Sequence, residues 1–112
     1  MQFSLRSTIS PPEANISLSG ELDIFSAAQV SREVDRALWS GCRRALLDTS
    51  DVTFIDASAL GVLVRAGDLM RSCRGTMEIV AFSPVVLKLC LLTGLASLLG
   101  DAADVSDSRQ PV

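Results

Sequence analysis

The chain begins with two short segments in which apolar and polar residues alternate. The first runs from Phe3 to Ile9 and the second from Ala14 to Leu18, with Ser10-Pro11-Pro12 between them. A period of two with one apolar face is typical of a half-buried strand. Because the proline pair closes the first segment, the pattern predicts a β-hairpin.

An apolar stripe of helical period follows the hairpin. Its residues repeat at spacings of three and four, at Val30, Val34, Ala37 and Leu38. These positions fall on one face of a helix, with charged residues on the other. Ser26 is predicted to be the N-cap, with Gln29 completing a weak capping box, and the helix is expected to end near Gly41.

The middle of the chain carries two apolar runs and then a second helical stripe. The run Arg44–Asp48 predicts a short central strand. The run Val52–Ile55 is interpreted as a further strand or only a loop. Apolar residues then fall on one helical face, at Leu60, Leu63, Val64, Gly67 and Met70. They predict a helix from Ser58 to about Cys73, with Ser58 in the N-cap position.

The last third of the chain predicts one more strand and a very apolar helix. Met77–Phe82 is the strand, and Ser83-Pro84 open a helix over Val85–Thr93 with proline at its first position. The apolar arc of this helix is too wide for one buried face. The helix is therefore either buried on two sides or leaves part of its apolar surface exposed for a partner. We expect part of one group of side chains to be exposed for a partner or a weak homodimer, namely Val86, Leu87, Cys90 and Leu91.

Alternating strands and helices indicate an α/β fold. The order β-β-α-β-α-β-α predicts a mixed β-sheet of four to five strands flanked by α-helices, parallel in its later part. We expect one domain over residues 1–100. Leu95, Leu98 and Leu99 are expected to add a final turn, and residues 101–112 form a flexible acidic tail.

Composition narrows the possible partners and the compartment. The 112 residues carry 10 Lys and Arg against 13 Asp and Glu, a net charge of −3. The basic residues are scattered, which argues against nucleic acid as a partner. The N-terminus lacks the features of a signal peptide and no run could span a bilayer, so a cytoplasmic protein is expected. Three cysteines without paired spacing are predicted to be buried, reduced and unbridged: Cys42, Cys73 and Cys90.

Several kinds of catalytic site are excluded by missing residues. The chain has no histidine, which removes histidine-based triads and histidine-containing zinc sites. Ser58 lacks the glycines of a nucleophile elbow, and Lys88 is the only lysine and does not follow a phosphate-binding loop. A receiver domain phosphorylated on Asp48 would need an acidic pair after the first strand and a lysine after a late strand, and both are missing.

Ser58 is the main candidate for a functional residue. Its hydroxyl either caps the helix or accepts a phosphate, and the local pattern alone leaves both interpretations open. Loops at the carboxyl ends of neighbouring parallel strands converge. We therefore expect Asp23 and Asp56 to flank Ser58, although each is also a common turn or cap residue.

Four segments of the chain resemble one known family. They are Gly20-Glu21-Leu22-Asp23, Leu46–Ser50, Val52–Gly61 and Leu92-Thr93-Gly94-Leu95. They resemble the STAS-domain anti-sigma-factor antagonists over roughly residues 3 to 99, most specifically in the Asp-x-Ser-x-Leu-Gly segment. Ala59 stands where the family usually has glycine.

The resemblance implies a regulatory domain with no catalysis, cofactor or metal of its own. Its partner would be an anti-sigma factor that is also a serine kinase. Binding frees a sigma factor, phosphorylation of Ser58 ends the binding, and a serine phosphatase restores it. The implied contact residues are Asp23, Asp56, Ala57, Ser58, Ala59 and Leu60. The alternatives are an unphosphorylated STAS interaction module or a sensor of a small molecule or nucleotide.

Overall fold

The computed structural model describes residues 2–94, which form four strands and three helices in the predicted order. The expected final turn and acidic tail lie outside the described residues. The elements are β1 (Phe3–Ser10), β2 (Glu13–Leu22), α1 (Ile24–Trp39), β3 (Arg44–Ile55), α2 (Ala57–Ser72), β4 (Thr76–Phe82) and α3 (Pro84–Leu92).

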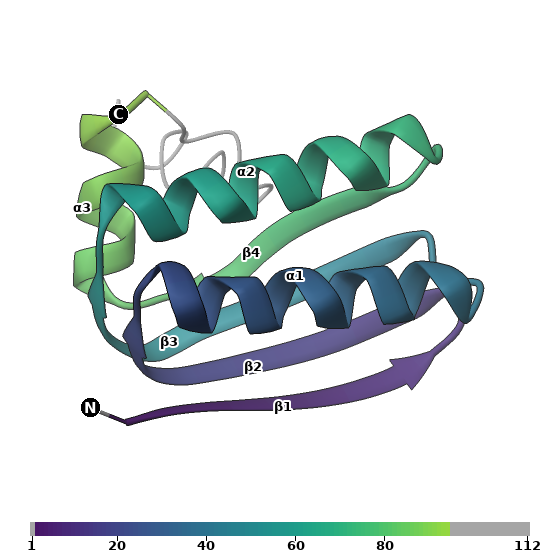
Figure 1. The fold of residues 1–112 in the computed structure, drawn as a ribbon, viewed down its shortest axis with the longest axis horizontal. Coiled ribbons are helices and arrows are strands. Elements are labelled where there is room, and N and C mark those ends of the chain that lie inside the picture. The colour runs from purple at the N-terminus through teal and green to yellow at the C-terminus, as the bar shows by residue number, and fades with distance from the viewer. Residues whose placement is uncertain (1, 95–112) are drawn as a thin grey trace, which may run out of the picture.

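The four strands form one mixed sheet in the order β1-β2-β3-β4. β1 and β2 make the predicted antiparallel hairpin, while β3 runs parallel to β2 and β4 runs parallel to β3. Helices α1 and α2 are the two crossover connections. Crossovers of one hand that advance in one direction along a sheet cover the same face, and α1 and α2 lie side by side on it (Figure 1). The predicted α/β fold with a mixed sheet is confirmed.

The hydrophobic core lies between this sheet face and the helices. Its largest fully buried side chains come from both layers: Ile16, Leu22, Leu47 and Ile79 from the strands, and Val30, Val34, Leu60, Leu63 and Met70 from α1 and α2. Such residues each contribute about 1.5–3 kcal/mol when removed from water. The core therefore fixes how α1 and α2 sit on the strands, and with them the two ends of the helical layer.

β3 is a single strand of 12 residues, longer than the predicted strand Arg44–Asp48. It pairs with β2 as far as Ile55 but with β4 only as far as Thr49. Register shifts in both pairings accommodate the polar middle of the strand, which hides the period of two from sequence inspection. The run Val52–Ile55, left open as strand or loop, is therefore the second half of β3.

The N-cap of α1 is Asp23, so the prediction of Ser26 is wrong. Asp23 has an extended backbone, and its carboxylate accepts hydrogen bonds from the backbone N–H groups of Phe25 at 3.0 Å and Ser26 at 2.9 Å. The Ser26 hydroxyl accepts from the Asp23 N–H at 2.8 Å. Ser26 therefore belongs to a capping box as its third helical residue, because Asp23 already occupies the cap.

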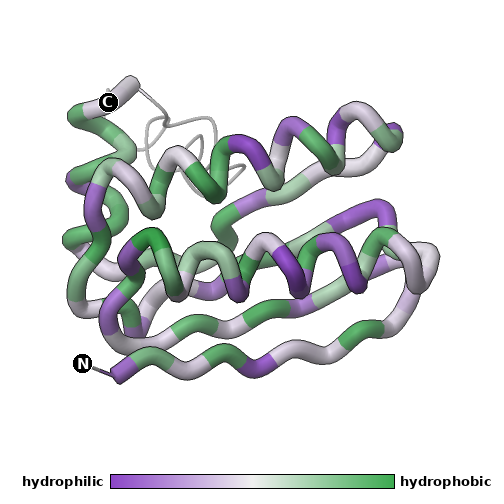
Figure 2. Tube along the Cα trace, in the orientation of Figure 1, coloured by the Kyte–Doolittle hydropathy of each residue, from purple (hydrophilic) through white to green (hydrophobic). Residues whose placement is uncertain are grey.

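α3 is as apolar as predicted and is only partly covered. Figure 2 shows it as a mainly hydrophobic segment at the end of the molecule where α2 begins. Val86 and Cys90 are buried, whereas Leu91 is 57% exposed. The expectation that some of its apolar side chains would be exposed is confirmed by Leu91, while Val86 and Cys90 belong to the core.

The three cysteines are free, as predicted, but they are not alike. Cys42 and Cys90 are buried, and Cys73 is exposed. The expectation that all three are buried is wrong for Cys73, because it is the C-cap of α2 at the surface, where the chain turns back toward β4.

Candidate functional site

The parallel strands β2 and β3 end side by side. Leu22 of β2 pairs with Ile55 of β3, and neighbouring strands lie about 4.8 Å apart. Each strand then passes through an aspartate into a helix, Asp23 into α1 and Asp56 into α2. The structure thus brings these two carboxylates, both expected from the sequence, to the same edge of the sheet.

Ser58 lies at this edge as the second residue of α2. The helix begins at Ala57, and its N-cap is Asp56, whose carboxylate accepts a hydrogen bond from the Ala59 N–H at 2.8 Å. The prediction of Ser58 as N-cap is wrong because Asp56 makes the cap bond two residues earlier. Ser58 is nevertheless exposed, so the prediction of an accessible serine at the start of a helix is confirmed.

The Asp23 carboxylate is held in its ionised form by its cap bonds. The backbone N–H of Ser26 has the largest effect and the Ser26 hydroxyl the next, and together they lower the pKa of Asp23 below its ordinary value. A fixed negative charge therefore lies one strand away from the start of α2.

Two of the contact residues implied by the resemblance are not at the surface. Ala59 and Leu60 are buried at 0% and 1% exposure, and both belong to the main core cluster. Their side chains help to seat α2 on the sheet and cannot touch a protein that docks from outside. Asp23, Asp56, Ala57 and Ser58 remain accessible at least in part.

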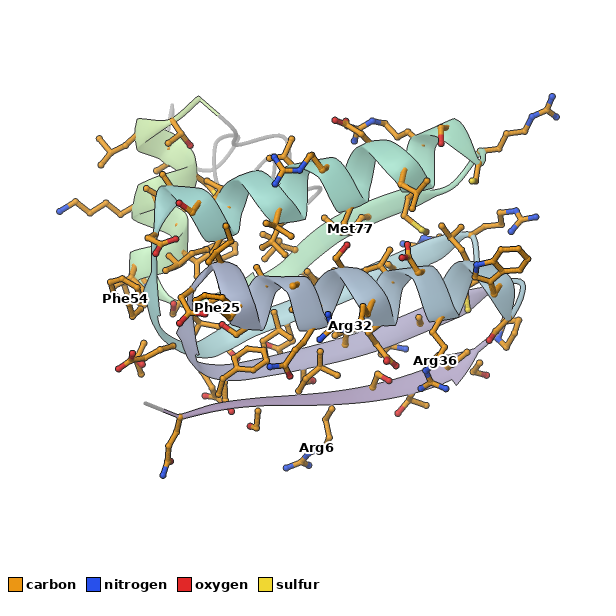
Figure 3. The ribbon with its side chains drawn as sticks, viewed as in Figure 1. Arg6, Phe25, Arg32, Arg36, Phe54 and Met77 are labelled. Atoms are coloured by element: carbon orange, nitrogen blue, oxygen red, sulfur yellow. The ribbon has the colours of Figure 1, made fainter. Side chains whose placement is uncertain are left out.

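Sequence inspection missed three apolar side chains at this end of the molecule. Ile24 is 47% exposed, Phe25 is 79% exposed and Phe54 is 45% exposed. Figure 3 shows Phe25 and Phe54 at the same end, where α1 and α2 begin. Phe25 could have been found from the sequence, because it falls outside the stripe of Val30 and Val34 that faces the core. We call Ile24, Phe25, Phe54, Ala57 and Ser58, together with the two capping aspartates, the Ser58 surface.

Within residues 2–94, no group of three or more His, Cys, Asp or Glu residues is arranged to hold a metal ion. In the same part of the chain, no helix has the length and hydrophobicity needed to cross a membrane. What the Ser58 surface offers chemically is an accessible hydroxyl, two carboxylates and exposed aromatic rings.

Comparison with known proteins finds several anti-sigma-factor antagonists. The anti-sigma F factor antagonist of Paenibacillus polymyxa is 29% identical over 85 residues, which cover 75% of this chain and 73% of that protein. An anti-sigma factor antagonist from Mycobacterium paratuberculosis has the same fold, with a TM-score of 0.74 at 20% identity over 94% of this chain and 93% of its own. The Bacillus cell fate determinant SpoIIAA in its phosphorylated form aligns with a TM-score of 0.66 at 21% identity, covering 87% of each chain.

A family match covers nearly the whole described chain. Residues 5–100 match the family described as "Mlab, STAS domain". That range contains the helical layer, the exposed serine at the start of α2 and all of the four-stranded sheet except the first two residues of β1. The chain therefore belongs to the STAS-domain family.

Proposed function

We propose that this chain is an anti-sigma-factor antagonist that is switched by phosphorylation of Ser58. In its unmodified form it binds an anti-sigma factor that is also a serine kinase, and this binding releases a sigma factor. A phosphate on Ser58 ends the binding and a serine phosphatase restores it. The observation that carries the proposal is the exposed hydroxyl of Ser58 in the first turn of α2, in a chain similar to anti-sigma-factor antagonists.

Electrostatics at the start of α2 explain why a phosphate would change binding and not the fold. A phosphoserine carries about −1.5 to −2 charges at neutral pH. The free N–H groups of a first helical turn and the helix dipole favour a negative charge there, so the helix tolerates it. The carboxylates of Asp56 and Asp23 lie at the same edge. A partner covering all three groups would have to bury several negative charges, which is costly without matching cations.

The exposed aromatic side chains supply the attractive part of the contact. Phe25 and Phe54 lie at the same end as Ser58 and are accessible in the free chain. Aromatic residues buried at the centre of an interface carry much of its binding free energy. We assign Phe25 and Phe54 the role of binding anchors. The two rings supply the binding free energy, and the phosphorylation state of Ser58 decides whether the partner can bind over them.

The proposal is tested by phosphate transfer. The purified chain is incubated with its anti-sigma factor kinase and ATP, and intact mass is measured. We expect one phosphate on the wild type and none on Ser58→Ala. Ser72→Ala is the matched control, because Ser72 is an exposed serine at the other end of α2, and it should be phosphorylated like the wild type. Binding of the kinase without any transfer to Ser58 would instead identify an unphosphorylated STAS interaction module.

A further inference from the structure

A second surface lies at the opposite end of the helical layer, where α1 and α2 finish. A groove of about 320 Å³ is lined there by Asp35, Leu38, Trp39, Arg43, Leu69 and Cys73. Trp39 is 90% exposed and Leu69 is 42% exposed. A tryptophan buries about 150–250 Å² when it is covered, so this is the largest apolar side chain that the described chain leaves to water. We call these six residues the Trp39 groove.

Two opposite charges in the Trp39 groove have no ion-pair partner among residues 2–94. They are the carboxylate of Asp35 and the guanidinium of Arg43, whose Nη1 donates a hydrogen bond only to the carbonyl oxygen of Cys42, at 3.1 Å. Three other arginines in this half of the molecule form ion pairs, as Arg36–Glu33, Arg44–Glu13 and Arg71–Asp68. Arg74 has no ion pair within residues 2–94, but it does not line the groove. The groove therefore presents one unpaired charge of each sign beside an exposed tryptophan.

We propose that the Trp39 groove binds a second copy of this chain through a two-fold symmetric contact. In such a contact residue i of one copy meets residue j of the other and the reverse pair forms as well. A surface that carries both an acid and a base is complementary to itself under this symmetry. Asp35 of each copy pairs with Arg43 of the other, and the two Trp39 rings are covered by the apolar floor made of Leu38 and Leu69.

α3 is less suited to this role, although its wide apolar arc led us to expect a weak homodimer there from the sequence. Its exposed apolar residues Leu91 and Leu92 are accompanied by a single charged residue, Lys88. Two copies meeting through α3 would bring like charges together, which opposes association. The self-complementary charges are at the other end of the molecule, in the Trp39 groove.

Charge reversal tests the contact. Sedimentation equilibrium is measured over a rising concentration series for the wild type, Asp35→Arg and Arg43→Asp. The wild type should associate, and each variant alone should associate at least tenfold more weakly, because both reciprocal pairs become repulsive. An equimolar mixture of the two variants should associate again. Substituted position 35 of one copy then meets substituted position 43 of the other with opposite charge, and the native Arg43 and Asp35 form the second pair. The unfolding temperature of each variant should stay close to that of the wild type, because Arg43 is exposed, Asp35 is partly exposed and neither forms an ion pair within residues 2–94.

Two residues of the groove report the contact directly. Trp39 is the only tryptophan of the chain, so association should shift its emission to shorter wavelength as concentration rises. Cys73 is the exposed thiol of the groove, and a short thiol cross-linker should join two wild-type copies but not two copies of Asp35→Arg.

Three results would overturn the proposal. The first is a wild type that stays monomeric across the series. The second is a dimer that survives both single reversals, which would place self-association on another face. The third is a Trp39 emission that is already blue-shifted in a sample that sedimentation shows to be monomeric, which would show that the same chain covers the groove.

Discussion

Phe25 and Ser58 hold the same position in two successive units of the fold, since each is the second residue of a helix that follows one of two paired parallel strands. The strands end in register, at Leu22 and Ile55, and each helix is capped by an aspartate. One local framework therefore presents an aromatic ring in one unit and a hydroxyl in the next. The two helix starts therefore present the ring of Phe25 and the hydroxyl of Ser58 at the same edge of the sheet.

Ser58→Asp separates a switch residue from a merely structural one. An aspartate in the first turn of α2 interacts favourably with the helix dipole, by about 0.3–1 kcal/mol. The unfolding temperature should therefore be unchanged or slightly higher. Binding to the anti-sigma factor, measured by titration calorimetry, should weaken at least tenfold, because the new charge adds to Asp56 and Asp23. Ser58→Asn is the matched neutral control and should bind like the wild type. Equal affinity of the Asp and Asn variants would show that negative charge at position 58 does not weaken binding.

Phe25→Ala should weaken the anti-sigma factor complex without weakening the fold. The ring is 79% exposed, so its loss costs the free chain little, while truncation of an interface anchor costs about 2 kcal/mol or more. Val80→Ala serves as the control, because Val80 is an exposed apolar residue on β4, away from the Ser58 surface. Both affinities are read by calorimetry, and a Phe25→Ala complex as tight as that of Val80→Ala would place the contact elsewhere.

Gly20→Ala should destabilise the fold, and Gly61→Ala should not. Gly20 has φ +91°, and a Cβ there would collide with the carbonyl oxygen of Gln2, which accepts a hydrogen bond from the Glu21 N–H at 2.9 Å. Strain at such a position costs about 1–3 kcal/mol. Gly61 lies inside α2 with ordinary space around it, so alanine there should stabilise by about 0.5–1 kcal/mol. Urea unfolding of both variants checks the sign of each change.

The cap of α1 should make stability depend on pH in the acid range. The folded-state pKa of Asp23 is lowered by its cap bonds, so its contribution is fully present above the ordinary aspartate pKa of about 4 and is lost as pH falls through the lowered folded value. Asp23→Asn keeps a good cap residue but cannot titrate. Between about pH 4 and pH 2 the unfolding free energy of this variant should therefore fall less steeply than that of the wild type. If the unfolding free energies of the two proteins fell with the same slope between about pH 4 and pH 2, the Asp23 cap would not contribute to the acid dependence.

The thiols should react in two classes. Cys73 is exposed, whereas Cys42 and Cys90 are buried, and burial raises the pKa of the Cys90 thiol, which keeps it protonated and unreactive. A thiol reagent should therefore label one cysteine rapidly in the native chain and all three in denaturant. Cys73→Ser should abolish the rapid phase, and a rapid phase that remained would mean that a second thiol is accessible.

Hydrophobic periodicity predicted the hairpin, α1 and α2, because each of these elements has one face that must be buried. Short apolar runs and turn residues predicted β4, α3 and the first half of β3. Periodicity could not place the caps. Asp23 and Ser26 are both good N-caps three residues apart, as Asp56 and Ser58 are two residues apart, and only the backbone conformation decides which one is used. The continuity of β3 was also hidden, because its second half lacks β4 as a neighbour.

The two surfaces also differ in how far the sequence predicts them. Ser58 is part of a short local motif and could be found from it. The Trp39 groove combines the last turns of α1 and α2 with the loop before β3. Trp39 and Leu69 are far apart in the sequence and meet only because both helices cross over the same sheet face. Periodicity within one element carries no information about such a pairing.

The length of β3 separates the Trp39 groove from the Ser58 surface. At about 3.3 Å per residue its 12 residues span roughly 40 Å, with the Trp39 groove near its first residue and the Ser58 surface at its last. Two copies joined at the groove would carry their Ser58 surfaces at the outer ends, as a bivalent molecule. A target with two matching sites would then be retained by effective concentration as well as by affinity. One phosphate per dimer would leave a single unmodified Ser58 surface, so the affinity for such a target would fall to that of one site. The target would then begin to dissociate before every copy is phosphorylated.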